Sequence, residues 1–155
     1  MMRKAFILLL CVCVNCILYA QTPVAKNGAL HVEGSKILNQ YNQEPQLRGL
    51  SFSWSLWGGR KYYNPAVTDW RVNDFKVSIV RVAMGVQPEH GYLEEPELQR
   101  QLVVDAVDQA IKDGIYVLID WHDHNGNLHT GQAKAFFADM AKKYPGLIIG
   151  IKTAH

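Results

Sequence analysis

The sequence predicts an α/β fold in which a parallel β-sheet is covered by α-helices. Stretches rich in aliphatic and β-branched residues alternate with stretches whose apolar residues recur at helical spacing. The step from one predicted strand to the next has the length of a βαβ unit, which favours parallel strands. The chain has 155 residues, of which 48% are hydrophobic and 19% charged, so its composition is that of a globular protein.

The first 20 residues have the layout of a secretory signal peptide. Arg3 and Lys4 give a basic start, residues 5–18 are almost wholly apolar, and Ala20 is a small residue at the expected cleavage point. The apolar run is shorter than the roughly 20 residues that cross a bilayer. We therefore expect cleavage and a secreted, extracellular product; the alternatives are an uncleaved anchor and a lipid anchor on Cys16.

Cleavage would also change the cysteine content and the charge. Cys11, Cys13 and Cys16 all lie in this segment, so the remaining chain would hold neither a disulfide nor a cysteine-bound metal. Of 16 Lys and Arg and 14 Asp and Glu, loss of Arg3 and Lys4 leaves 14 of each. A net charge near zero gives no reason to expect binding to nucleic acid or to an anionic membrane. We expect a monomer.

A small β-hairpin is predicted ahead of the sheet. Residues 21–28 are a polar lead-in, and the expected domain covers 29–155. Residues 29–32 and 37–38 flank Glu33, Gly34 and Ser35, which are typical of a tight turn. The first strand of the sheet is then predicted over 47–52.

Helices and strands alternate from there on. Asn64 and Pro65 are the cap and the first residue of a predicted helix. Val67, Trp70 and Phe75 give this helix an apolar side. The other predicted elements are helices that run from Pro96 to the C-cap Gly114 and over 133–141, and strands over 77–84, 115–119 and 147–151.

Two architectures fit this order of elements, an open doubly wound sheet and a β/α barrel. No glycine-rich phosphate loop follows any predicted strand, which disfavours the nucleotide-binding versions. In both architectures the functional residues lie where the strands end and in the loops that follow. Three predicted strand ends carry unusual residues.

The first strand end is followed by a loop rich in Ser, Gly and Trp. Ser53, Trp54 and Trp57 lie in it. A flat indole can stack on the apolar face of a sugar ring while hydroxyl groups bond to the ring edges. We assign this role to Trp57 before Trp54; the alternative is a Trp that closes the top of the core.

The second strand end belongs to a strand that contains Arg81 among apolar neighbours. A charge at such a position is costly unless it is paired, so a carboxylate should lie nearby. Arg81 would hold a catalytic carboxylate in place and ionised. The alternatives are a structural ion pair and a strand face open to solvent.

The third strand end reads Asp-Trp-His-Asp-His over 120–124. Asp120, His122 and His124 share one face if the strand continues through them. The set could bind a metal ion, since His-x-His is a known ligand arrangement. It could instead form hydrogen bonds to a substrate or a catalytic carboxylate, or be a solvated polar loop. The spacing leaves all three open.

Taken in order, these stretches resemble glycoside hydrolase family 5, in its cellulase (endo-β-1,4-glucanase) branch. The matching segments are 46–51, 57–59, 79–86, 91–93 and 116–122, within a resemblance that covers roughly 29–149. The resemblance implies a (β/α)8 barrel whose bottom is closed by the hairpin. It also implies hydrolysis of O-glycosidic bonds in β-1,4-glucan with retention, so the partner would be a β-glucan polysaccharide or oligosaccharide. No metal and no cofactor is needed.

The resemblance also assigns roles to individual residues. Arg81 would steady the nucleophile carboxylate, and His122 would form hydrogen bonds in the subsite where the bond is cut. Trp57 would stack on a glucose to the non-reducing side. Ser53 stands where related enzymes often have a His, and Trp54 follows it, so both roles stay open. The expected substrate-binding residues are Trp57, Trp54, Ser53 and His124, the last a looser match.

The catalytic carboxylates of this chemistry are not found in the sequence. Retaining hydrolysis needs two carboxylates about 5 Å apart. In the family the acid/base Glu follows an Asn at the end of the fourth strand, and the nucleophile Glu ends the seventh. Here residues 152–155 read Lys-Thr-Ala-His, and Asp120 and Asp123 match neither role. Arg81 therefore has no predicted carboxylate to steady.

We therefore expect an incomplete barrel of about four β/α units that is inactive as it stands. A β/α barrel takes about 250 residues, and at least about 200. Two alternatives are kept. One is a non-catalytic glucan-binding module that uses Trp54 and Trp57. The other is a metal-dependent hydrolase that uses Asp120, His122 and His124.

Overall fold

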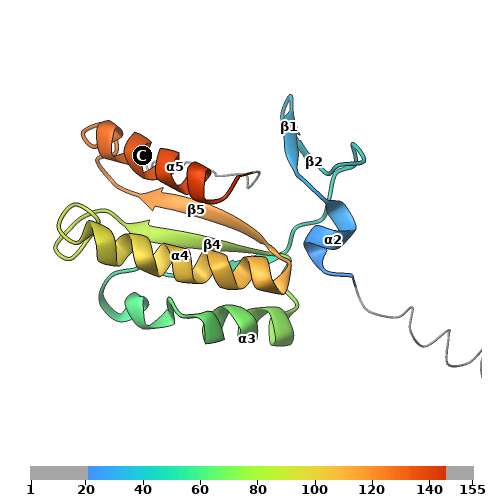
Figure 1. The fold of residues 1–155 in the computed structure, drawn as a ribbon, viewed down its shortest axis with the longest axis horizontal. Helices are drawn as coiled ribbons and strands as arrows, with labels where there is room; N and C mark the ends of the chain where they lie inside the picture. The colour runs from blue at the N-terminus through green and yellow to red at the C-terminus, as the bar shows by residue number, and fades with distance from the viewer. Residues whose placement is uncertain (1–20, 146–155) are drawn as a thin grey trace, which may run out of the picture.

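The structure is a computed structural model and describes residues 21–145. The expected signal peptide at 1–20, with its three cysteines, and the expected strand at 147–151 lie outside the described residues. The elements along the chain are α2 (Pro23–Asn27), β1 (His31–Glu33), β2 (Lys36–Leu38), β3 (Gly49–Ser51), η1 (Trp57–Tyr62), α3 (Pro65–Phe75), β4 (Ile79–Gly85), α4 (Pro96–Asp113), β5 (Tyr116–His122) and α5 (Thr130–Lys143) (Figure 1).

The main sheet has the order β3-β4-β5, and both strand pairs are parallel. Each strand is followed by helical structure that runs back across one side of the sheet (Figure 1). This arrangement confirms the α/β class and the parallel sheet that the alternating pattern predicts. The three sheet strands predicted within the described residues were right in place but not in length, since β3 is shorter than 47–52 and β5 continues to His122.

The two faces of the sheet differ in what covers them. Val80, Val82 and Met84 of β4 are fully buried and belong to one apolar cluster with side chains of the helices. Because successive side chains on a strand point to opposite faces, Ile79 and Arg81 lie on the other face. There they are only partly buried. The polar residues at the strand ends, described below, lie on this second face.

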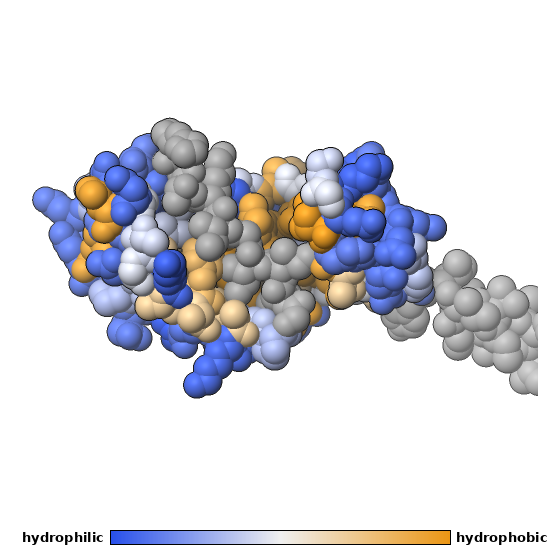
Figure 2. Space-filling model, turned by 90° about the horizontal axis from the view of Figure 1, so that it is seen from above, coloured by the Kyte–Doolittle hydropathy of each residue, from blue (hydrophilic) through white to orange (hydrophobic). Residues whose placement is uncertain are grey.

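The hairpin β1–β2 is antiparallel, as predicted, and lies at the end of the sheet where the strands begin. The lead-in at 21–28 is not extended, because Thr22 caps α2 with its hydroxyl and the Val24 N–H donates to the Gly114 carbonyl at 2.9 Å. An apolar pocket of about 360 Å³ separates the hairpin from the sheet. Hydrophobic surface is visible between the hairpin and the sheet in Figure 2. The residues that line the pocket include Val32, Ile37 and Tyr116.

Helix α3 starts as predicted but buries a different side. The Asn64 side chain accepts a hydrogen bond from the Val67 N–H, and Pro65 follows it. Trp70 and Phe75, however, are 50% and 55% exposed and pack edge-on against each other. At these two residues the apolar side of the helix is therefore not its buried side, because the helix directs its one fully buried residue, Thr68, toward the core.

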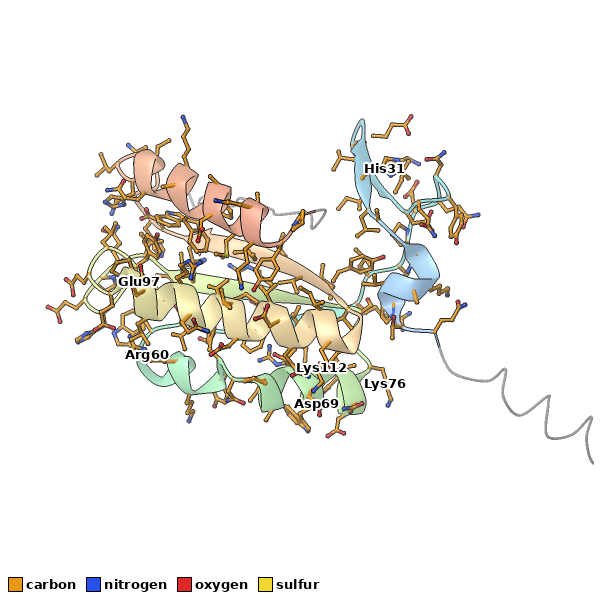
Figure 3. All side chains as sticks on the ribbon, in the orientation of Figure 1. His31, Arg60, Asp69, Lys76, Glu97 and Lys112 are labelled. Atoms are coloured by element: carbon orange, nitrogen blue, oxygen red, sulfur yellow. The ribbon has the colours of Figure 1, made fainter. Side chains whose placement is uncertain are left out.

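Helix α4 has the predicted bounds, and Gly114 ends it in the left-handed conformation, with φ 69°. Figure 3 orients the molecule: the labelled Arg60 and Glu97 lie near the end where the strands finish, and Lys76 and Lys112 lie toward the opposite end. None of the helices among residues 21–145 is both long enough and apolar enough to cross a membrane.

Candidate functional site

The site is built where β3, β4 and β5 end. In the parallel register Ser51 pairs with Arg81, and Gly85 pairs with His122. Arg81, Asp120 and His122 occupy alternate positions on the face that the helices leave uncovered. The fold therefore places the second and third strand-end groups that the sequence singles out side by side on this face, and the tryptophans of the first group lie next to them, as described below.

A charged cluster lies on this face. The Arg81 guanidinium forms an ion pair with the Asp120 carboxylate, and its Nη1 donates to the Ser51 hydroxyl at 2.7 Å. His122 Nδ1 lies 2.9 Å from Asp120 Oδ2 and 3.0 Å from Arg81 Nη2. Asp120 is 1% exposed, and a carboxylate buried to that degree needs a cation beside it.

Within the described residues Arg81 does meet a nearby carboxylate, as the sequence predicts for a charge among apolar neighbours, and the ion pair is of the structural kind kept there as an alternative. Its partner, Asp120, comes from the neighbouring strand, two residues beyond the position that pairs with Arg81. The signal was present in the sequence, because Arg81 and Asp120 are both charged residues inside otherwise apolar strand patterns. Two such residues on adjacent parallel strands are candidates to pair.

A row of aromatic rings lies beside the charged cluster. The Trp54 ring centroid is 4.4 Å from that of His122 and 5.3 Å from that of His124. Trp57 stacks on Trp54, with centroids 5.6 Å apart and 18° between the planes. Trp57 is 67% exposed, so its indole offers a flat apolar surface to solvent next to the histidines.

The backbone under Trp57 is held in an uncommon conformation. Trp57 has φ 46°, in the left-handed region that costs a bulky residue free energy. The chain then folds back so closely that a Cβ at Gly59 would lie 2.1 Å from the Trp54 carbonyl oxygen, so only glycine fits there. Backbone strain of this kind persists where the surroundings over-determine it, and it concentrates at functional sites.

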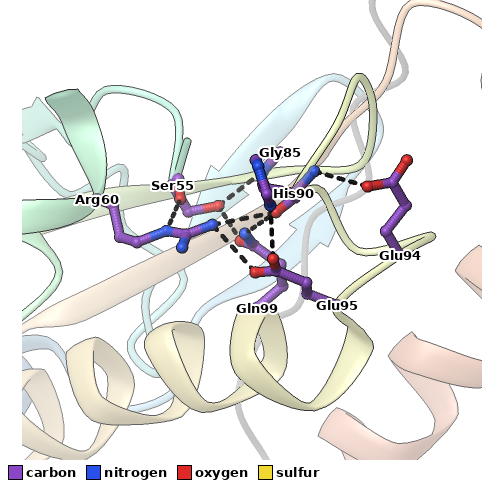
Figure 4. Close-up of polar contacts among 7 residues, drawn as sticks. All are labelled: Ser55, Arg60, Gly85, His90, Glu94, Glu95 and Gln99. Carbon is purple, nitrogen blue, oxygen red and sulfur yellow. Dashed lines mark hydrogen bonds and ion pairs between the residues drawn. The ribbon is translucent and has the colours of Figure 1, made fainter. Parts of the chain in front are cut away.

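A buried polar network fixes the loop that carries these two tryptophans (Figure 4). The Ser55 hydroxyl accepts from the Gly85 N–H at 2.9 Å and donates to the side-chain oxygen of Gln99, which is fully buried on α4. The Gln99 amide donates to the His90 carbonyl at 2.6 Å. The loop after β3, the end of β4 and the start of α4 are thus tied together.

Arg60 closes the same network from the solvent side. Its guanidinium donates to the carbonyls of Ser55 and His90 and pairs with Glu95 at 3.3 Å. A hydrogen bond between His90 and Glu95 lowers the pKa of the Glu95 carboxyl. Sequence reasoning missed this network. Gln99 falls on the apolar side of α4, one turn before Val103, and a polar residue there signals a buried hydrogen bond.

Tyr63 holds the backbone beneath Trp54. Its hydroxyl lies 2.7 Å from the Ser53 carbonyl and 2.6 Å from the Ala83 carbonyl, so one buried proton serves the loop after β3 and strand β4. Burial raises the pKa of Tyr63 far above its usual range, which keeps this donor protonated.

Asp123 organises the loop after β5. It is fully buried, and its two carboxylate oxygens contact Gln87, Trp121, the Asn125 N–H and His129 Nδ1 at 2.7–3.3 Å. Burial alone would raise the pKa of Asp123, but the Asn125 N–H and the bonds to His129 and Trp121 hold it below its usual value. Asp123 therefore stays ionised as a structural centre.

The remaining site residues of the sequence prediction lie at the rim. Ser53 is exposed, and its contact with the network is through its backbone carbonyl. His124 is also exposed, with its ring centroid 5.7 Å from that of His122. Within residues 21–145, no three His, Cys, Asp or Glu side chains are grouped so as to hold a metal ion. The cation beside Asp120 and His122 is the Arg81 guanidinium.

Known proteins match this chain in sequence and in structure. The family model described as Cellulase (glycosyl hydrolase family 5) matches residues 38–147. Endoglucanase 5 of Pectobacterium carotovorum subsp. carotovorum is 36% identical over 126 residues, which are 79% of this chain and 24% of that protein. A solved structure from Cytophaga hutchinsonii has a TM-score of 0.77 and 44% identity, over 83% of this chain and 42% of that one.

A further solved structure contains a ligand. It is a variant of the catalytic domain of the Thermobifida fusca endoglucanase Cel5A in complex with cellotetraose, with a TM-score of 0.74 and 27% identity, over 83% of this chain and 43% of that one. The chain spans about a quarter of the length of the curated relatives it matches.

The comparisons also settle the two architectures that the element order left open. The family is built on a (β/α)8 barrel, and the described residues form three consecutive β/α units of it, preceded by the hairpin. Helices on the outer face and polar strand ends on the inner face are the arrangement of such a barrel. The resemblance stated from the sequence is confirmed: the chain belongs to the cellulase family, glycosyl hydrolase family 5.

Proposed function

We propose that this chain forms part of the glucan-binding cleft of a secreted endo-β-1,4-glucanase. The observation that carries the proposal is the exposed indole of Trp57, stacked on Trp54 at the end of the sheet where a barrel binds its substrate. The relatives in sequence are endoglucanases, and a structural relative binds cellotetraose. A β-glucan polysaccharide or oligosaccharide is therefore the ligand that this site should accept.

Each site residue has a role in this proposal. Trp57 stacks on one glucose unit, and Trp54 supports it from behind and lines the cleft toward His122. The ring nitrogens of His122 and His124 and the Ser53 hydroxyl form hydrogen bonds to sugar hydroxyls. Residues 1–20 direct secretion as a cleaved signal peptide, the domain covers 29–155, and the folded chain is a monomer.

Arg81 supports the chemistry rather than performing it. Its guanidinium extends along the face that forms the barrel interior, between Ser51 and Asp120. It would steady the nucleophile carboxylate of a retaining mechanism by its positive charge. In the described residues Asp120 balances that charge in its place.

The two carboxylates of a retaining mechanism are not provided by the described residues. Of the carboxylates at the strand ends, Asp120 is engaged by Arg81 and His122, and Asp123 by four other groups. A retaining mechanism uses two carboxyl groups about 5 Å apart, one to protonate the leaving group and one to attack the sugar carbon. Neither Asp120 nor Asp123 is free for either role. We infer that the 155-residue chain binds β-1,4-glucan without hydrolysing it.

Two measurements on the same preparation test this. Titration with cello-oligosaccharides should change the tryptophan emission and saturate, because Trp57 and Trp54 lie at the binding surface. Incubation with carboxymethylcellulose should release no reducing sugar. An unchanged emission at millimolar ligand would contradict the glucan-binding cleft, whereas robust turnover would contradict the account of the carboxylates.

A further inference from the structure

Asp120 contacts two residues of the site with one oxygen. Its Oδ2 meets Arg81 Nη2 and, at 2.9 Å, His122 Nδ1. Its Oδ1 is buried and has no hydrogen-bond partner among residues 21–145. All the polar contacts of this buried carboxylate within the described residues are therefore directed at the Arg81–His122 pair.

The protonation of His122 follows from these contacts. Nδ1 lies between an acceptor, Asp120 Oδ2, and a donor, Arg81 Nη2 at 3.0 Å. A neutral imidazole carries one proton, so Nδ1 either donates to Asp120 or accepts from Arg81. Without a proton on Nδ1, its lone pair and the carboxylate would face each other at 2.9 Å. With the proton there, Asp120 accepts from both neighbours, and Arg81 keeps its ion pair.

The rest of the ring is held by packing. The Trp54 ring lies against His122 with a centroid distance of 4.4 Å and an interplanar angle of 60°. The His122 side chain is 17% exposed, and within the described part of the chain Nε2 makes no hydrogen bond. One nitrogen is thus fixed to the protein and the other is left for a ligand.

We propose that Asp120 is a positioning residue: it holds His122 in the tautomer with the proton on Nδ1, so that Nε2 is presented as a hydrogen-bond acceptor to a sugar hydroxyl. The identity of the ligand rests on the proposed function, but the tautomer does not. Asp120 acts through His122 and does not itself touch the sugar. A carboxylate that orients a histidine through Nδ1 is a general device for setting which nitrogen is free.

The test is the imidazole nitrogen NMR spectrum of the full, ¹⁵N-histidine-labelled chain, recorded at a pH at which the rings are neutral. The His122 signals are assigned from their loss in His122→Gln. In the unaltered chain the proton should be on Nδ1. In Asp120→Ala it should move to Nε2, because Arg81 is then the remaining partner of Nδ1. In Asp120→Asn it should stay on Nδ1, because Arg81, a donor only, requires the amide oxygen in the position of Oδ2.

Asp123→Asn is the matched control, since it alters a second buried Asp–His pair at the same strand end and should leave the His122 signals unchanged. A proton on Nε2 in the unaltered chain, or on Nδ1 in Asp120→Ala, would overturn the proposal. If Asp120→Ala does not fold, the unaltered chain and Asp120→Asn still decide it.

Cello-oligosaccharide affinity provides the second readout. Asp120→Ala should bind about three- to tenfold more weakly, as expected for the loss of one hydrogen bond, and Asp120→Asn should bind like the unaltered chain. Equal affinity in all three chains would contradict the role of His122 toward the sugar. An Nδ1 proton in a chain that binds no oligosaccharide would support the positioning by Asp120 and contradict the proposed function, so the two failures are distinguishable.

Discussion

The carboxylate of Asp120 on β5 forms an ion pair with the guanidinium of Arg81 on the adjacent strand β4. Asp120 is almost wholly buried, whereas the Arg81 side chain is 30% exposed. The pair therefore compensates a buried negative charge with a cation that still reaches the open face of the sheet. This pair and the contacts around it lead to four predictions.

Replacing Arg81 with Met should destabilise the chain, because it leaves the Asp120 carboxylate buried without its cation. Loss of one partner of a buried pair costs about 3–5 kcal/mol, and the partial exposure of Arg81 reduces this to about 2–4 kcal/mol. Urea titration would measure the free energy of unfolding. Arg100→Met, which breaks an exposed pair with Asp139, is the control and should cost less than about 1 kcal/mol. If both variants lose the same free energy of unfolding, the Arg81–Asp120 pair contributes no more to stability than an exposed pair, which would contradict this prediction.

Replacing Gln99 with Leu should lower the free energy of unfolding by about 1–3 kcal/mol, because the Ser55 hydroxyl loses its buried acceptor and the His90 carbonyl loses one of its two donors, keeping only Arg60. The near-ultraviolet circular dichroism of the tryptophans should also change, since the loop with Trp54 and Trp57 is released. Gln101→Leu, an exposed position on the same helix, should alter neither quantity. A Gln99→Leu chain of unchanged stability would contradict the network.

Acid should destabilise the chain through Asp123. Its pKa is lower in the folded chain than in the unfolded one, so the unfolded chain binds protons more readily. The stabilisation is therefore fully present above the usual Asp pKa of about 3.9 and is lost as the pH falls through the lower, folded value. Asp123→Asn should reduce the dependence of the free energy of unfolding on pH between about pH 6 and pH 2.

The matched control for this titration is Asp74→Asn, since Asp74 is exposed on α3. It should keep the acid dependence of the unaltered chain. If Asp123→Asn and the unaltered chain lose stability in parallel, Asp123 does not carry the acid sensitivity assigned to it.

The sequence predicts the elements better than it predicts their partners. The cap at Asn64, the stop at Gly114 and the alternation of strands and helices depend on local chemistry, which is legible along the chain. The exposure of Trp70 is not legible in this way, because hydrophobicity alone does not show which side of a short helix meets the core.

The candidate site shows the same division. Arg81, His122 and Trp57 could be selected from residue type and position at strand ends. Two charges inside apolar strand patterns mark Arg81 and Asp120 as candidates to pair. The pair itself and the bond from Ser55 to Gln99 could not be predicted, because they join residues 39 and 44 positions apart. Such contacts depend on strand register and helix docking, which the sequence pattern does not specify.

The central claim is that the exposed indole of Trp57 is a sugar-binding surface, and calorimetric titration of the full chain with cello-oligosaccharides tests it most directly. The matched control is Trp70→Ala, which removes another half-exposed tryptophan, on α3. Trp57→Ala should weaken binding at least about tenfold, as for a central aromatic contact, while Trp70→Ala should bind like the unaltered chain. Unchanged affinity in Trp57→Ala would contradict the claim.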